Sequence, residues 1–81
     1  MSILRKPAVK AELGFRSDTS VASSVRAGLL TKPIFLAQRS VGWPDYEIKA
    51  ITAARIAGKS EADIRALVTR LHTQRTELAT A

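Results

Sequence analysis

Residues 28–43 decide the fold, and they read GLLTKPIFLAQRSVGW. Pro33 excludes a helix through this stretch, because proline lacks a backbone N–H and its ring clashes with the preceding turn. The apolar residues at a spacing of two, which is the period of a half-buried strand, are Ile34, Leu36, Val41 and Trp43. Residues 37–40 interrupt this alternation, so the stretch predicts a β-hairpin of two short strands joined by a four-residue turn.

Two short helices are predicted before the hairpin. The first begins at Pro7, because proline suits the first helical position, and it ends at Gly14, since glycine adopts the left-handed cap conformation at little cost. The second begins near Ser17 or Asp18, which are both good N-caps, and it stops by Gly28. Two short helices linked by a glycine-containing turn and followed by a hairpin are the plan of a winged helix-turn-helix.

A third helix is predicted after the hairpin. It opens at Pro44, runs through an alanine-rich stretch to Ala57 and is capped by Gly58. Asp45 and Glu47 lie in its first turn, where negative charge suits the helix dipole. The dipole explains both carboxylates without a ligand.

The strongest periodic signal in the chain lies after residue 60. Residues 60–63 read SEAD and resemble a capping box, and the apolar residues that follow at helical spacing are Ile64, Leu67, Val68, Leu71 and Leu78. This apolar stripe either packs on the rest of the domain, which its small size favours, or faces a partner. We expect residues 1–58 to form the winged helix-turn-helix and residues 59–81 a C-terminal helix of the same domain.

Three side chains outside the charged set have simple expected roles. Trp43 follows Val41 at a spacing of two and precedes a helix, so its ring is expected in the core. Tyr46 lies in the first turn of the third helix and is expected to be half-buried. His72 lies off the apolar stripe and is expected at the surface, with no catalytic role.

The composition excludes several classes of protein. The 81 residues fit one domain with a small core, and they include no cysteine and one histidine, so we expect no metal site. The chain contains no P-loop, no Rossmann glycine motif and no nucleophile–base arrangement, so we expect no enzyme, catalytic residue or cofactor. Without an apolar run near the roughly 18 residues of a membrane span, a cytoplasmic protein is expected.

Positive charge is concentrated in the first half of the chain. Thirteen Lys and Arg against seven Asp and Glu leave a net charge of +6. Residues 1–43 (the N-terminal half) carry seven basic and two acidic side chains, a net +5, whereas residues 44–81 (the C-terminal half) carry six and five, a net +1. A one-sided positive field favours a polyanionic partner, nucleic acid above all. The alternative is a solvated basic surface that binds no ligand.

Residues 28–43 also resemble the core signature of a known family. The run from Lys32-Pro33 to Trp43 is similar to that of the AlpA family, small phage and prophage regulators with a MerR-like or excisionase-like winged helix. Matching features outside this run are Leu4-Arg5-Lys6-Pro7, Gly14-Phe15 and Glu47-Ile48, so the resemblance covers about residues 3–57. Phe35 departs from the polar or basic residue common in that strand, and an exposed aromatic there suits contact with a partner.

The resemblance implies a function on double-stranded DNA. It implies a mainly α fold with a small β-hairpin, and a transcriptional regulator of phage or mobile-element genes bound to the nucleoid. The alternative is an excisionase that bends DNA for an integrase, and a protein-interaction module such as an antirepressor is an alternative of another class. Candidate partners beyond DNA are a second copy of the chain, because one small module reads few bases, and an integrase or RNA polymerase, which the resemblance implies.

Candidate DNA contacts lie on the first two helices and the hairpin. Arg39 at the hairpin tip suits a phosphate or a narrow minor groove, and Arg16 suits a bidentate contact to guanine. Thr19, Ser20 and Ser23 either contact base edges or only cap and solvate the second helix. The remaining candidates, as phosphate contacts, are Lys6, Lys10, Arg26 and Lys32.

Overall fold

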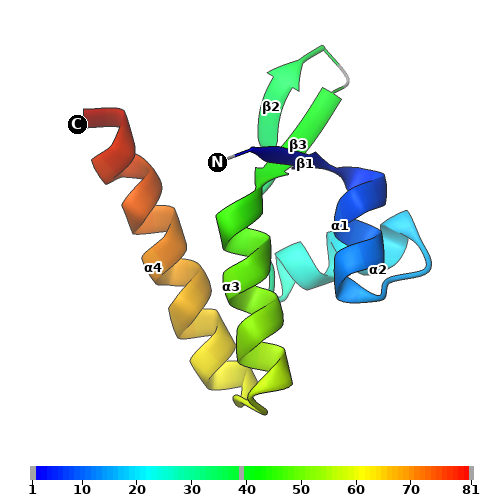
Figure 1. Cartoon of the computed structure of the whole chain (residues 1–81), viewed down its shortest axis with the longest axis vertical. Coiled ribbons are helices and arrows are strands. Elements are labelled where there is room, and N and C mark those ends of the chain that lie inside the picture. Colours follow the sequence, from blue (N-terminus) through cyan, green and yellow to red (C-terminus); the bar gives the residue numbers. More distant parts are fainter. Residues whose placement is uncertain (1, 39, 81) are drawn as a thin grey trace.

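The computed structural model describes residues 2–38 and 40–80, and Figure 1 shows their arrangement. Within these ranges the chain forms four helices and one antiparallel three-stranded sheet. In chain order the elements are β1 (Ile3–Arg5), α1 (Lys6–Leu13), α2 (Asp18–Arg26), β2 (Ile34–Ala37), β3 (Ser40–Pro44), α3 (Asp45–Ile56) and α4 (Glu61–Thr80). Helix α3 lies between α4 and α1 (Figure 1). Across the described ranges, no helix is long and apolar enough to cross a membrane.

The predicted hairpin is confirmed, but its turn is shorter than predicted. Strands β2 and β3 pair antiparallel, and Ala37 pairs with Ser40 at the end of the hairpin. Positions 38 and 39 alone therefore separate the paired residues, and Arg39, the expected tip contact, lies outside the described residues. The register shifts between Phe35 and Ala37, an irregularity that the alternation of apolar residues does not signal.

The sequence did not predict strand β1, which completes the sheet. It pairs antiparallel with β3, with Leu4 opposite Trp43, so the strand order is β1–β3–β2. Three residues are too few to show an alternating pattern, and pairing with β3 gives them their conformation. Gly42 allows the close approach, because a Cβ at that position would lie 2.5 Å from Cγ2 of Ile3 and 3.0 Å from the carbonyl oxygen of Leu4.

The ends of the central helices follow the predicted caps with one exception. Ser17 is the N-cap of α2, and its Oγ accepts a hydrogen bond from the backbone N–H of Ser20 at 3.2 Å. Gly28 follows the helix with a φ of +78°, a conformation that glycine adopts without strain. Helix α3 begins at Asp45 and not at Pro44, because Pro44 is still paired in the sheet as the last residue of β3.

The core is a single cluster shared by the sheet and all four described helices. Its buried apolar members are Val9, Val21, Leu30, Trp43, Ile48, Ile51, Ile64, Val68 and Leu71. Trp43 is confirmed as a core residue, and its indole N–H donates to the carbonyl of Thr31 at 2.7 Å. The three buried residues from α4 belong to the stripe predicted there, whereas the side chain of Leu78 lies outside the described residues. Tyr46 is half-buried, as predicted.

Helix α4 is tied to α3 by a buried ion pair that the sequence did not predict. Arg75 donates from Nε to one carboxylate oxygen of Glu47 at 2.8 Å and from Nη2 to the other at 2.6 Å. Glu47 is fully buried, so the interpretation that it only serves the helix dipole is wrong. The two residues lie 28 positions apart in the sequence, and no local pattern joins them.

The same face of α4 holds the segment that leads into β2. Arg75 donates a further hydrogen bond from Nη2 to the carbonyl of Lys32 at 2.7 Å, and Nε2 of His72 accepts one from the backbone N–H of Lys32 at 3.0 Å. The prediction of His72 as a surface residue is confirmed only in part, because its ring is half-buried against this segment. Burial and the positive charge of Arg75 both lower the pKa of His72, which keeps its ring neutral and able to accept.

Candidate nucleic-acid interface

Helix α2 presents a small, polar outer face. Val21 is buried and Val25 half-buried on its inner side, as the sequence predicts, whereas Thr19, Ser23 and Arg26 are exposed. Ser20 is half-buried, and its hydroxyl lies 3.2 Å from Oγ of Ser17 within the N-cap. The outer face therefore leaves two hydroxyls and one guanidinium for a ligand, while the hydroxyl of Ser20 is engaged at the start of the helix.

The candidate cations differ in whether the protein already neutralises them. Among the residues that the structure describes, no salt bridge involves Lys6, Arg16, Arg26 or Lys32. Lys10 instead pairs with Asp18 at 2.9 Å. Its hydrogen bond and charge hold the pKa of the Asp18 carboxyl below the usual value. Lys10 thus joins α1 to α2 at the surface, and the carboxylate of Asp18 offsets part of its positive charge.

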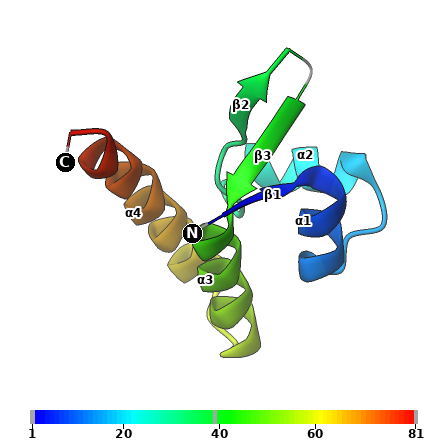
Figure 2. The same cartoon turned by 45° about the horizontal axis from the view of Figure 1, so that its top comes forward.

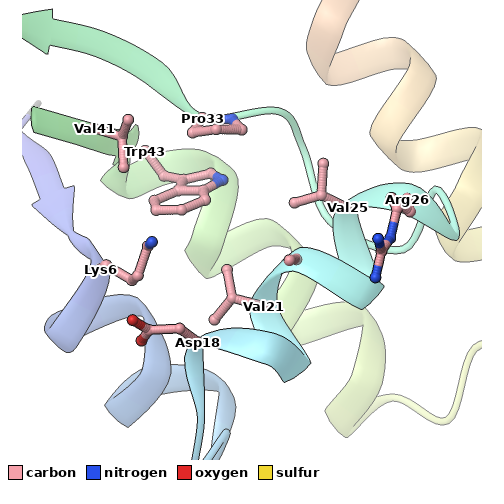
Figure 3. A pocket seen from close by; sticks show the side chains of 9 residues that line it. Lys6, Asp18, Val21, Val25, Arg26, Pro33, Val41 and Trp43 are labelled. Atoms are coloured by element: carbon pink, nitrogen blue, oxygen red, sulfur yellow. The ribbon is translucent and has the colours of Figure 1, made fainter. Parts of the chain in front are cut away.

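An apolar groove lies between α2 and β3 (Figure 3), with a volume of about 330 Å³. Its apolar lining comes from α2, β3 and the segment before β2, and consists of Val21, Ala22, Val25, Pro33, Val41 and Trp43. Lys6 and Arg26 line it from opposite sides in Figure 3, and Asp18 lies beside Lys6. The groove thus brings two candidate cations from different helices to one place, beside the base of the hairpin.

The hairpin projects from the body of the protein, as Figure 2 shows. The side chain of Phe35 is 83% exposed and that of Leu36 is 42% exposed, so the exposed aromatic predicted in this strand is confirmed. Lys32 is exposed just before β2, and its backbone is fixed by α4. The base of the hairpin is therefore held firmly to the body, while the described part of its outer end carries neutral side chains.

Arg5 is a cation of this region that the sequence prediction of the site omitted. It is exposed on β1, and its Nη2 donates to Oγ of Ser40 on β3 at 3.3 Å. A second surface hollow beside the groove is lined by Arg5, Lys6, Pro7 and Val41. Arg5 was omitted because the sequence did not predict β1, and only the pairing of β1 with β3 places Arg5 next to the hairpin.

Comparisons with known proteins add no family assignment. No protein-family model, curated protein or solved structure matches this chain. The resemblance of residues 3–57 to the AlpA family therefore stays a hypothesis from the sequence. Within the described ranges, no group of three or more His, Cys, Asp and Glu side chains is placed to hold a metal ion.

Proposed function

We propose that this chain is a double-stranded DNA-binding regulator of phage or mobile-element genes, with a winged helix-turn-helix of the AlpA kind. In this proposal α2 enters the major groove, and the β2–β3 hairpin lies on the backbone or in the minor groove. One observation carries the proposal: Lys6 and Arg26, both without a salt bridge among the described residues, flank a groove formed jointly by α2 and the base of the hairpin.

The side chains on α2 suit close approach to a duplex. Thr19 and Ser23 are short, so they allow the helix backbone near base edges, although hydroxyls discriminate bases weakly. Arg16, exposed in the turn before α2, is the candidate for a bidentate contact to guanine, worth about 1–3 kcal/mol of discrimination. Arg26 and Lys32 are the candidates for phosphate contacts, which set position and not sequence.

A titration of the full chain against a labelled random-sequence duplex tests this function. We expect retention at low salt and a slope of log affinity against log salt of about −4 to −5, because about five phosphate contacts each contribute about −0.9. Fluorescence anisotropy at several salt concentrations measures the slope. A chain that shows no retention of duplex at low salt is not a DNA-binding protein.

The exposed Phe35 favours a second candidate, a protein-interaction module such as an antirepressor. An aromatic ring that is 83% exposed on a projecting strand is typical of a surface that meets a protein partner. This candidate predicts that no duplex is bound at moderate salt, and that replacing Phe35 by Ser removes partner binding. The same anisotropy titration separates the two functions at moderate salt, where we expect a DNA-binding regulator to retain duplex and an interaction module to retain none.

A further inference from the structure

We propose that the groove between α2 and β3 seats one strand of the DNA backbone, with a deoxyribose on its apolar floor and Lys6 and Arg26 on the phosphates to either side. This inference rests on the proposed function and adds which atoms of the DNA this part of the protein binds. It also assigns a role to an apolar hollow that the core does not fill.

The size and lining of the groove suit a small apolar unit. Its volume of about 330 Å³ lies at the lower end of the range of small-molecule sites, about 300–1,000 Å³. The floor offers no free donor from Trp43, because the indole N–H is bonded to the carbonyl of Thr31 at 2.7 Å. A peptide backbone laid on this floor leaves polar groups unpaired, which is costly, whereas the faces of a deoxyribose carry mostly C–H groups.

The charges at the edges of the groove match a sugar between two phosphates. Lys6 comes from α1 and Arg26 from the last turn of α2, so two positive charges lie on opposite sides of an apolar floor (Figure 3). Asp18 also lines the groove, beside Lys6. The charges of Lys10, which pairs with it at 2.9 Å, and of Lys6 both act on its carboxylate and offset its repulsion of an anion. The ligand that matches is apolar in its centre and anionic at both ends.

Filling the groove tests the inference directly. Ala22 is exposed on α2 and lines the groove, so the substitution Ala22→Leu places a larger side chain in it. Leucine has nearly the helix propensity of alanine, which favours retention of the fold. Ala53→Leu, at an exposed position in α3, is the matched control. We expect duplex affinity at low salt to fall about tenfold for Ala22→Leu and less than twofold for Ala53→Leu.

A double variant distinguishes the groove from a contact between Ala22 and base edges. Lys6→Gln alone is expected to reduce the salt slope of the parent protein by about 0.9, the value of one phosphate contact. In the Ala22→Leu background the DNA strand is already excluded from the groove. Adding Lys6→Gln should therefore change neither the duplex affinity nor the salt slope further. Circular dichroism and thermal unfolding of each variant check that the fold is kept.

The outcomes separate this inference from the proposed function. If the parent protein binds duplex and Ala22→Leu binds it with the same affinity, the inference about the groove is overturned and the DNA-binding function is kept. Additive effects of Ala22→Leu and Lys6→Gln also overturn it, because Ala22 then meets DNA elsewhere. Failure of the parent protein to bind duplex removes both.

Discussion

The two halves of the chain use their positive charges differently. Among the described residues, Lys10 is the one cation of six in the N-terminal half that forms a salt bridge, whereas Lys49, Arg65 and Arg75 do so among six in the C-terminal half. Most of the described cations around α1, α2 and the hairpin therefore form no salt bridge within the fold. Net charge alone is therefore a poor guide to a binding surface. The informative property is whether a cationic side chain already forms a salt bridge with a carboxylate.

The buried pair between α3 and α4 gives the largest expected effect. Replacing Arg75 by Ala leaves the fully buried carboxylate of Glu47 without its partner, so the free energy of unfolding should fall by about 3–5 kcal/mol. Urea denaturation measures the change. As the control, Lys49→Ala removes the pair between the exposed Lys49 and Asp45, whose charged atoms lie 3.9 Å apart, and should cost less than about 0.5 kcal/mol. Equal losses of stability in the two variants would contradict a larger contribution of the buried Glu47–Arg75 pair.

Close packing of the backbone at Gly42 gives the second largest expected effect, and it lies in the N-terminal half. Gly42→Ala places a Cβ 2.5 Å from Cγ2 of Ile3, which pushes β1 away from β3 and should lower the free energy of unfolding by about 1–3 kcal/mol. The control Ser40→Ala removes only the hydrogen bond from Arg5 and should change stability by no more than about 0.5 kcal/mol. A Gly42→Ala protein as stable as its parent would show that the sheet tolerates the displacement.

Two variants that each remove one exposed arginine test whether the position of a positive charge decides DNA binding. Arg26→Ala and Arg70→Ala each remove one exposed positive charge, from α2 and from α4 respectively. If position decides binding, Arg26→Ala should weaken duplex binding about five- to tenfold and reduce the salt slope by about 0.9, while Arg70→Ala should change affinity less than twofold. Anisotropy titrations give both quantities, and equal losses would mean that total charge alone governs binding.

The smallest expected effect is a pH dependence that arises at His72. Because burial lowers the pKa of His72 in the folded protein, the unfolded chain takes up the proton first as the pH falls. The contribution of His72 to the free energy of unfolding is therefore full above the pKa of the unfolded chain, about 6.5. It decreases as the pH falls through the pKa of the folded protein. Urea denaturation between pH 7.5 and 5 measures the decrease, which His72→Gln should remove. The Asp18 and Asp45 carboxyls, whose pKa values are lowered, titrate below this window.

Local sequence patterns predicted most of the secondary structure but little of its assembly. Capping residues and apolar spacing predicted the helices and the hairpin, because Ser17, Gly28 and Pro33 each restrict the backbone of adjacent residues. Strand β1 and the contacts of Arg75 and His72 were missed, because each depends on a partner at least 28 positions away. Such pairings are decided by the folded chain as a whole and leave no periodic signal.

The structure bears on the exposure and pairing of the candidate interface residues, and their contact with DNA stays a prediction. Composition and the outer face of α2 singled out Thr19, Ser23 and Arg26, and these side chains are exposed. The sequence did not show that Lys10 is paired with Asp18, nor that Arg5 lies beside the hairpin. Both facts depend on how α1, α2 and β1 pack, which residue spacing within one element does not reveal.

The hydrogen bonds from α4 to Lys32 have a consequence for biosynthesis. His72 and Arg75 lie about half a chain length after the peptide they hold, at separations of 40 and 43 residues. The nascent polypeptide can form α1, α2 and the hairpin earlier, since local structure needs only nearby residues. The linker before β2 nevertheless lacks both hydrogen bonds until residue 75 has emerged from the ribosome, so its final geometry is fixed later in synthesis than that of α1 and α2.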